Sequence, residues 1–242
     1  PYGVEEGGTM RGIELLPIRT IFAEKKTRTR VRGTARFSEA GEPVVLVDGR
    51  GNWYEGEIDR AEAKGCGVRI LEKKEEYGKR PFRLHLAVAP TKNIDRTEWM
   101  LEKCTEMGID AITMLNSEHS ERKVVKDERL EKVLVAAMKQ SLKAYLPEFH
   151  TMTGFKDFVA ACTEKHKFIA HCHAGEKLRL DEAYQPGDDV VILIGPEGDF
   201  SEEEVAFAEK NGFRAITLGC SRLRTETAGI VACHSIDFMN RV

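Results

Sequence analysis

The chain has 242 residues, of which 41% are hydrophobic, and it carries a formal net charge of −3. This length suits one large domain or two small ones with an ordinary buried core, and the charge argues against a globally basic nucleic-acid-binding protein. No stretch approaches the ~20 consecutive apolar residues of a membrane-spanning helix, and no secretory segment opens the sequence. A cytoplasmic location without a membrane partner is therefore expected.

The cysteines show no CxxC spacing; they are Cys66, Cys104, Cys162, Cys172, Cys220 and Cys233. Several stand within apolar patterns, where cysteine packs as a small hydrophobic residue, so a reduced intracellular protein is expected. His171 and His173 stand two apart and could share one face of a strand. As metal ligands they would need further partners, and no recognisable spacing supplies them, so no metal site is predicted.

The first part of the chain, up to about residue 40, has little apolar pattern. Residues 1–9 are rich in Gly and Glu and are expected to form a loop. A basic segment follows over residues 19–36, in which Glu24 is the only acidic residue. Its basic residues are Arg19, Lys25, Lys26, Arg28, Arg30, Arg32 and Arg36. Such a segment is typical of a phosphate-binding surface and equally typical of a solvated arm.

From Pro43 onward, short apolar runs alternate with glycine-rich turns. Residues 44–54 predict a strand, a turn and a second strand, and Gly67–Leu71 predicts another strand. Several short strands in succession favour a small β-barrel. Residues 73–83 are charged and are expected to link this barrel to a different kind of domain. We therefore predict a barrel domain over residues 1–76 and an α/β domain over residues 84–242.

Apolar strands alternate with helices in the second domain. Asp95 is expected to cap a helix, and Glu98 is expected to complete a capping box. Trp99, Cys104 and Met107 should face inward along this helix, and Gly108 should end it. A long amphipathic helix is predicted over residues 127–145, ended by Pro147. Further strands are predicted at residues 84–89, 109–115 and 167–172, and a short helix at 155–162. Repeated βα units predict a mostly parallel sheet with helices on both faces.

Two strand–loop–helix units close the sequence. In the first, the apolar run Val190–Ile194 leads into the turn Gly195-Pro-Glu-Gly198, and Ser201 with Glu204 forms a capping box. In the second, a strand runs to Leu218, a glycine-containing loop follows, and a helix starts at Thr225. Because ligands bind at the carboxyl ends of strands in open α/β sheets, the two loops predict a binding site.

These segments resemble the signature of one family. Ile194-Gly-Pro-Glu-Gly198, Leu218-Gly219 and Leu223-Arg-Thr-Glu-Thr-Ala228 are similar to the motifs of the ribosomal RNA small subunit methyltransferase E family. The family comprises SPOUT-class enzymes that methylate N3 of a uridine in 16S ribosomal RNA. The resemblance implies a trefoil-knotted parallel sheet that binds S-adenosylmethionine, a PUA-like N-terminal barrel and a homodimer.

Further segments carry the same resemblance. Leu46–Gly51 matches the family's N-terminal domain, and Leu84–Lys92, Lys103–Gly108 and Ser117–Lys123 match its second domain. The sequence departs from the family in two places. Residues 30–36 differ from the usual pattern, and Leu142-Lys143 stands where members often have Gly-Arg.

The resemblance assigns the cofactor to the two glycine-bearing loops and to the strand before them. The predicted cofactor-binding residues are His171, Ile194, Gly195, Pro196, Glu197, Gly198, Leu218, Gly219, Leu223, Thr225 and Ala228. Two ordinary strand–helix turns are the structural alternative. The presence of both motifs in order favours the cofactor site.

Arg224 is the predicted catalytic residue, because its permanent cation could orient a uridine or stabilise charge on its carbonyl groups. Arg122, Lys143 and Arg222 are predicted to contact RNA. Alternatively, Arg222 or Arg224 pairs with Glu226 and braces the helix start. Glu197 could hold its loop in place by accepting backbone N–H bonds, or it could act as the general base. The structural role is favoured, and the base stays unassigned.

Two other functions fit the same sequence. One is ribose 2′-O methylation by another SPOUT enzyme, and the other is a catalytically inactive RNA-binding protein. A dinucleotide enzyme is not supported, because no G-x-G-x-x-G or G-x-x-x-x-G-K-[ST] motif is present. Ile230, His234 and Phe238 recur at helical spacing near the end of the chain, where they predict either a dimer interface or core packing.

Overall fold

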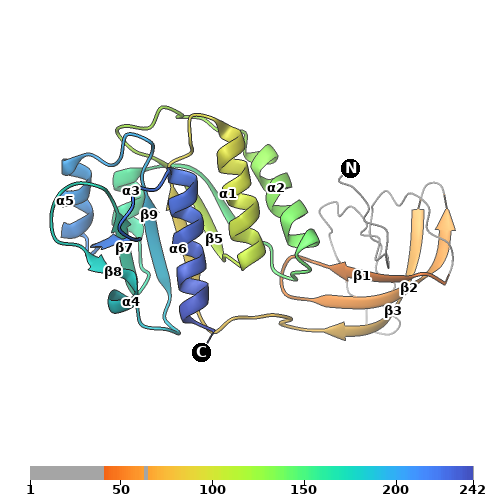
Figure 1. The fold of residues 1–242 in the computed structure, drawn as a ribbon. Helices are drawn as coiled ribbons and strands as arrows, with labels where there is room; N and C mark the ends of the chain where they lie inside the picture. The colour runs from red at the N-terminus through yellow and green to blue at the C-terminus, as the bar shows by residue number, and fades with distance from the viewer. Residues whose placement is uncertain (1–40, 63–64, 242) are drawn as a thin grey trace. The chain divides into compact units, whose positions relative to one another are not determined.

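The computed structural model describes residues 41–62 and 65–241 (Figure 1). The chain divides into two compact units. One runs to Lys79 and includes Lys143–Tyr145, and the other comprises Arg80–Leu142 and Leu146–Val242. The predicted basic segment and the atypical residues 30–36 lie outside the described residues.

The first unit contains an antiparallel sheet with the strand order β1-β2-β3. Its strands are β1 (Pro43–Val47), β2 (Trp53–Glu62) and β3 (Gly65–Lys74). Val44, Leu46 and Ile58 form its buried core. The turn after β1 closes because Asp48 Oδ1 accepts from the backbone N–H of Arg50 at 2.8 Å and of Asn52 at 3.1 Å. The predicted strands are confirmed, whereas closure into a barrel stays a prediction.

The second unit is built on a seven-stranded sheet in the order β6-β5-β4-β9-β7-β10-β8, and every strand pair in it is parallel. The strands are β4 (Leu84–Val88), β5 (Ala111–Asn116), β6 (Glu148–Gly154), β7 (His166–Ala170), β8 (Leu178–Arg179), β9 (Val190–Ile194) and β10 (Arg214–Thr217). β4 and β9 are buried along their whole length, which explains why β9 is entirely apolar and why β4 is apolar except at His85.

Helices cover both faces of this sheet, as the βα repeats predict (Figure 1). They are α1 (Ile94–Met107), α2 (Asp127–Gln140), α3 (Phe155–Ala161), α4 (Leu180–Ala183), α5 (Glu202–Lys210) and α6 (Thr225–Met239). Residues of α1, α2 and α6 share one core cluster, whereas residues of α3 and α5 share another with Phe200 and Phe213. The α/β class and the parallel sheet are therefore confirmed.

Two helix predictions are wrong in detail. The N-cap of α1 is Asn93, whose side chain accepts from the N–H of Asp95 at 3.1 Å, so Asp95 lies inside the helix. Trp99 is 49% exposed instead of facing inward, whereas Cys104 is buried. Helix α2 ends at Gln140, before the predicted end, because Leu142 adopts a φ of 54° that leaves the helical region.

Three elements were not predicted. β6 lies at the edge of the sheet, and β8 and α4 are short. Strand β6 reads Glu-Phe-His-Thr-Met-Thr-Gly, with no fully buried residue, so its sequence lacks the apolar run that identifies β4 and β9. An edge strand needs less apolar surface than a central one, which is why the pattern is weak.

Candidate functional site

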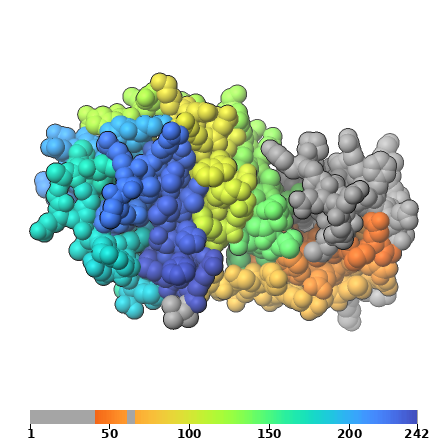
Figure 2. All heavy atoms as spheres, viewed as in Figure 1, coloured from red at the N-terminus to blue at the C-terminus, as the bar shows by residue number. Residues whose placement is uncertain are grey.

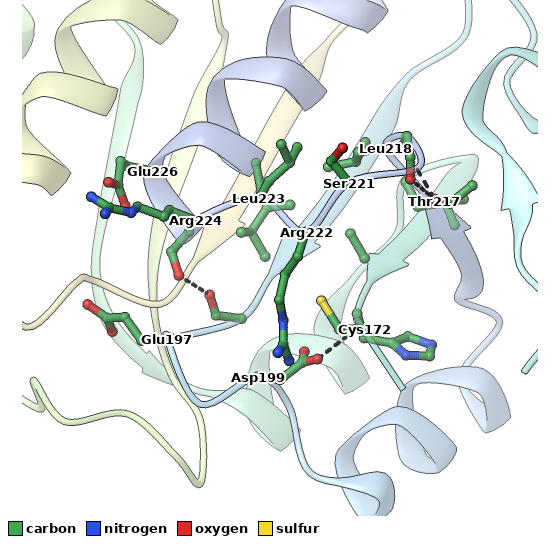
Figure 3. Close-up of a pocket in the computed structure, with 18 of the residues that line it drawn as sticks. Cys172, Glu197, Asp199, Thr217, Leu218, Ser221, Arg222, Leu223, Arg224 and Glu226 are labelled. Carbon is green, nitrogen blue, oxygen red and sulfur yellow. Dashed lines mark hydrogen bonds between the residues drawn. The ribbon is translucent and has the colours of Figure 1, made fainter. Parts of the chain in front are cut away.

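A pocket of about 980 Å³ lies where β7, β9 and β10 end (Figure 3). Both predicted loops line it. The lining residues are Arg96, Ala170, His171, Cys172, Lys177, Ile194, Gly195, Pro196, Glu197, Asp199, Ile216, Thr217, Leu218, Gly219, Cys220, Ser221, Arg222, Leu223, Arg224, Thr225, Glu226 and Ala228. Its volume is in the range of small-molecule sites.

The first loop folds tightly on itself. A Cβ atom at Gly195 would lie 3.1 Å from the backbone nitrogen of Phe200, so glycine is needed for the loop's own closure. The N–H of Asp199 donates to the carbonyl of Pro196 at 2.9 Å, and Asp199 Oδ2 accepts from the N–H of Cys172 at 2.6 Å. The loop after β9 is thereby tied to the end of β7.

The second loop is joined to the first by a buried side chain. Thr225 Oγ1 donates to the carbonyl oxygen of Gly195 at 3.0 Å. Gly219 has a φ of 140°, which L-residues rarely adopt, and its vacant Cβ position faces open space. Glycine is required there by the backbone conformation. The pocket wall therefore consists of two loops held in fixed relation.

Two pocket side chains carry buried polar atoms that have no hydrogen-bond partner among the described residues. Both ring nitrogens of His171 are buried without a hydrogen bond, and so is Oε2 of Glu226. Burial, followed by the charge of Lys177, holds the pKa of His171 below its usual range, so its neutral form is favoured. Buried polar atoms are normally satisfied, and these atoms therefore indicate a polar ligand.

Two arginines border the pocket with their side chains unengaged. Arg222 and Arg224 are exposed and have no side-chain hydrogen bond or ion pair with any described residue. Glu226 pairs with Arg96, whose Nη1 lies 3.8 Å from Oε1. The alternative in which Arg222 or Arg224 braces the helix through Glu226 is therefore wrong, because Arg96 of α1 takes that place.

The structure brings together every predicted cofactor residue except Gly198. A Cβ atom at Gly198 would lie 3.0 Å from Cβ of His119, whose Nδ1 is 3.1 Å from the carbonyl oxygen of Gly198. Gly198 thus packs against the loop after β5 and does not line the pocket. Its glycine is explained by that close packing.

The three residues predicted to contact RNA belong to different segments of the chain. Arg222 borders the pocket. Arg122 donates from Nε to the carbonyl of Thr91 at 3.1 Å and from Nη2 to the carbonyl of Lys92 at 2.6 Å, so it braces the loop before α1. Lys143 belongs to the other compact unit.

Glu197 takes the structural role that was favoured for it. Its Oε1 accepts from the backbone N–H of Lys92 at 2.9 Å and so connects the loop after β9 to the loop after β4. Sequence reasoning missed Arg96, Cys172, Lys177 and Asp199 as pocket residues. Asp199 follows the Gly-Pro-Glu-Gly turn directly and Cys172 stands next to the predicted His171, so a place near the pocket could have been inferred for these two.

In residues 41–62 and 65–241, no group of three or more His, Cys, Asp or Glu side chains is arranged to hold a metal ion. None of the helices in these ranges combines the length and apolar character needed to cross a lipid bilayer.

Comparison with known proteins gives concordant matches. The sequence pattern of the RNA methyltransferase domain matches residues 78–237. The ribosomal RNA small subunit methyltransferase E of Mesomycoplasma hyopneumoniae is 31% identical over 153 residues, which cover 61% of this chain and 65% of that protein.

Two solved structures are similar over most of their length. A probable rRNA methyltransferase from Porphyromonas gingivalis is 41% identical with a TM-score of 0.80, covering 84% of this chain and 88% of its own. The ribosomal RNA small subunit methyltransferase E of Neisseria gonorrhoeae, bound to S-adenosylmethionine, is 26% identical with a TM-score of 0.76. The match covers 83% of this chain and 84% of the Neisseria chain. The chain therefore belongs to the RNA methyltransferase family and, within it, to the ribosomal RNA small subunit methyltransferase E group.

Proposed function

We propose that this chain transfers a methyl group from S-adenosylmethionine to N3 of a uridine in 16S ribosomal RNA of the small subunit. The observation that carries the proposal is the pocket after β7, β9 and β10. Its two linked loops bear the family's residues, and two unpaired arginines border it. The S-adenosylmethionine bound to the Neisseria relative supports this choice of cofactor.

The lining chemistry fits this cofactor. Its adenosine and methionine parts need apolar contacts, hydrogen bonds and a place for charged ends. Ile194, Leu218 and Ala228 supply apolar surface, and the backbone of the two loops supplies N–H and C=O groups. The ring nitrogens of His171 add polar partners that no described residue satisfies. When bound, S-adenosylmethionine supplies an electrophilic methyl group.

The two arginines at the pocket, Arg222 and Arg224, would bind the RNA substrate. Arg224 directly precedes α6, and its cation stabilises the negative charge that develops on a uridine carbonyl as N3 loses its proton. Arg222, also at the pocket, pairs with an RNA phosphate. Arg122 and Lys143 are further RNA contacts in this proposal.

The function is tested by nucleoside analysis of small-subunit RNA after incubation with the protein and S-adenosylmethionine. N3-methyluridine is the expected product. Arg224→Ala is expected to lower the rate by about 10²-fold while calorimetry shows unchanged cofactor affinity, because an electrostatic contact to the reacting base is lost. Arg241→Ala removes an exposed arginine at the far end of α6 and serves as the matched control.

Other outcomes identify the alternatives. A ribose 2′-O-methylated product would replace the proposed activity with another methylation. A folded protein that binds RNA but not S-adenosylmethionine would indicate an inactive RNA-binding protein.

The assembly proposed with this function is a homodimer in the cytoplasm. Helices α1 and α6 lie side by side and form one continuous surface (Figures 1 and 2). Trp99 on α1 is 49% exposed and Phe238 on α6 is 64% exposed, with His234 stacked on the Phe238 ring. Large apolar side chains exposed on adjacent helices are typical of an interface, and we assign this face to a second copy.

The fold proposed with it is a trefoil knot formed by the segments around the two pocket loops, preceded by a PUA-like barrel. The knot is supported by the adjacent parallel strands β9, β7 and β10 and by α6, which returns to pack on β4 and β9. The antiparallel sheet β1-β2-β3 supports the barrel.

A further inference from the structure

The carboxylate of Glu226 is held in an unusual position in the pocket. The residue is 7% exposed and lies in the first turn of α6, two residues after Arg224. One oxygen, Oε1, is 3.8 Å from Nη1 of Arg96, and the other, Oε2, is buried without any donor among the described residues. Ionised carboxylates accept hydrogen bonds through both oxygens, so Oε2 has an unused acceptor site.

The other carboxylates of the pocket already have partners. Glu197 accepts a backbone N–H of Lys92. Asp199 accepts the N–H of Phe200 through Oδ1 and the N–H of Cys172 through Oδ2. Among the described pocket carboxylates, Glu226 therefore stands out because its unpartnered oxygen is buried, whereas Glu197 is exposed to solvent.

Positive groups surround the carboxylate of Glu226. Arg96 supplies a positive charge from α1, and the amino end of α6 contributes the positive end of the helix dipole. Arg224, the residue assigned to the uridine, lies beside Glu226 on the same side of the pocket (Figure 3). His171, just after β7 and next to Cys172, is the other described pocket residue with buried unsatisfied atoms.

We propose that Glu226 is the general base of the reaction and accepts the N3 proton of the uridine. This inference rests on the proposed function. The N3–H proton moves to a carboxylate oxygen of Glu226, and the electron pair left on N3 forms the new N–CH₃ bond. The S–CH₃ bond breaks with its electron pair kept by sulfur. The protonated Glu226 then releases its proton to solvent, which completes the balance.

Glu226→Gln tests this assignment because it keeps the size of the side chain and removes its basicity. The methylation rate is expected to fall by at least about 10²-fold. Calorimetric affinity for S-adenosylmethionine and thermal stability should stay close to those of the unmodified protein. Glu203→Gln, which alters an exposed carboxylate in the first turn of α5, is the matched control and should leave all three measurements unchanged.

A second readout separates a base from a structural residue. Raising the pH removes the N3 proton from uridine without help from the protein, so the defect of Glu226→Gln should shrink at high pH. A substrate RNA carrying 5-fluorouridine, whose N3 proton is more acidic, should restore the variant more than it accelerates the unmodified protein. A structural defect would respond to neither change.

Three results would overturn the assignment. The first is a Glu226→Gln variant of normal rate, and the second is a rate defect that is equal at every pH and with both RNAs. The third is a loss of cofactor affinity that accounts for the whole defect, which would make Glu226 a cofactor ligand. If the unmodified protein forms N3-methyluridine, these results leave the proposed function standing, whereas a ribose-methylated product would remove both.

Discussion

At the scale of single residues, Gly195 shows how a signature glycine can serve the loop instead of the ligand. Its conformation does not require glycine, since its φ is not positive. The space does require it, because a Cβ atom would meet the backbone nitrogen of Phe200 at 3.1 Å and its ring at 3.2 Å. Any larger residue must therefore move the loop that lines the pocket.

Gly195→Ala is expected to weaken S-adenosylmethionine binding by about tenfold, because a backbone displacement of a few tenths of an ångström costs on the order of 1–2 kcal/mol at a close-packed site. Isothermal calorimetry measures this loss. Gly154→Ala is the matched control, because the added Cβ there meets only the carboxylate of Asp157, at 3.1 Å. Unchanged affinity in Gly195→Ala would contradict the role assigned to the loop.

The sequence predicted the pocket loops well and Arg96 not at all, and the difference is physical. Gly195, Gly219 and Thr225 carry local signals, because tight turns and helix starts need particular residue types. Arg96 reaches Glu226 only through the packing of α1 against α6, at a separation that no local pattern encodes. The vacancy at Glu226 Oε2 is likewise a property of the folded pocket.

At the scale of elements, local chemistry decided which boundaries were predictable. The capping box of α5 is present as expected, with Ser201 Oγ accepting from Glu204 N at 3.3 Å and Glu204 Oε2 accepting from Ser201 N at 3.0 Å. At α1 the N-cap is Asn93, two residues before the predicted Asp95. Helix α2 was predicted too long because its apolar stripe continues past the residue at which its backbone leaves the helix.

A buried hydrogen-bonded chain connects three elements at the opposite end of the sheet. His85 on β4 is 6% exposed. Its Nδ1 lies 2.8 Å from Oε1 of Glu164, in the loop between α3 and β7, and its Nε2 lies 2.8 Å from Oγ1 of Thr113 on β5. The hydrogen bond from His85, partly offset by burial, lowers the pKa of Glu164 from 4.5 to about 2.

This depressed pKa predicts a pH-dependent contribution to folding stability. The ionised Glu164 stabilises the folded protein at pH values above 4.5, its pKa in the unfolded chain, and the contribution is lost as the pH falls toward about 2. Glu164→Gln is therefore expected to lower the free energy of unfolding by about 2 kcal/mol at neutral pH. The difference from the unmodified protein should shrink on acidification.

Urea unfolding at a series of pH values measures this difference. Glu121→Gln, which removes an exposed partner of Lys92, should change stability by less than about 1 kcal/mol throughout. The difference in free energy of unfolding between Glu164→Gln and the unmodified protein could instead stay constant from neutral pH down to the folded pKa. That result would show that Glu164 stabilises the fold through packing and neutral hydrogen bonds and not through its charge.

At the scale of the whole molecule, the exposed face of α1 and α6 predicts self-association. Phe238→Glu places a charge in the proposed interface and is expected to raise the dissociation constant at least about tenfold, since an unpaired buried charge costs more than 1.4 kcal/mol. Analytical ultracentrifugation measures the change. Leu71→Glu, at a side chain equally exposed at 64% but on β3, is the control. A monomeric unmodified protein would remove this interface from the proposal.

The position of α6 in the sequence determines when the pocket can form during synthesis of the chain. Thr225, Glu226 and Ala228 line the pocket from the start of this last helix, which packs against α1 and β4. A growing chain that has produced β4 to β10 therefore has all seven strands of the sheet but no complete pocket. Ligand affinity should arise only after residues 225–239 have been synthesised and have docked. From that moment, bound ligand favours the docked helix over the undocked one, so the ligand helps to complete the fold that binds it.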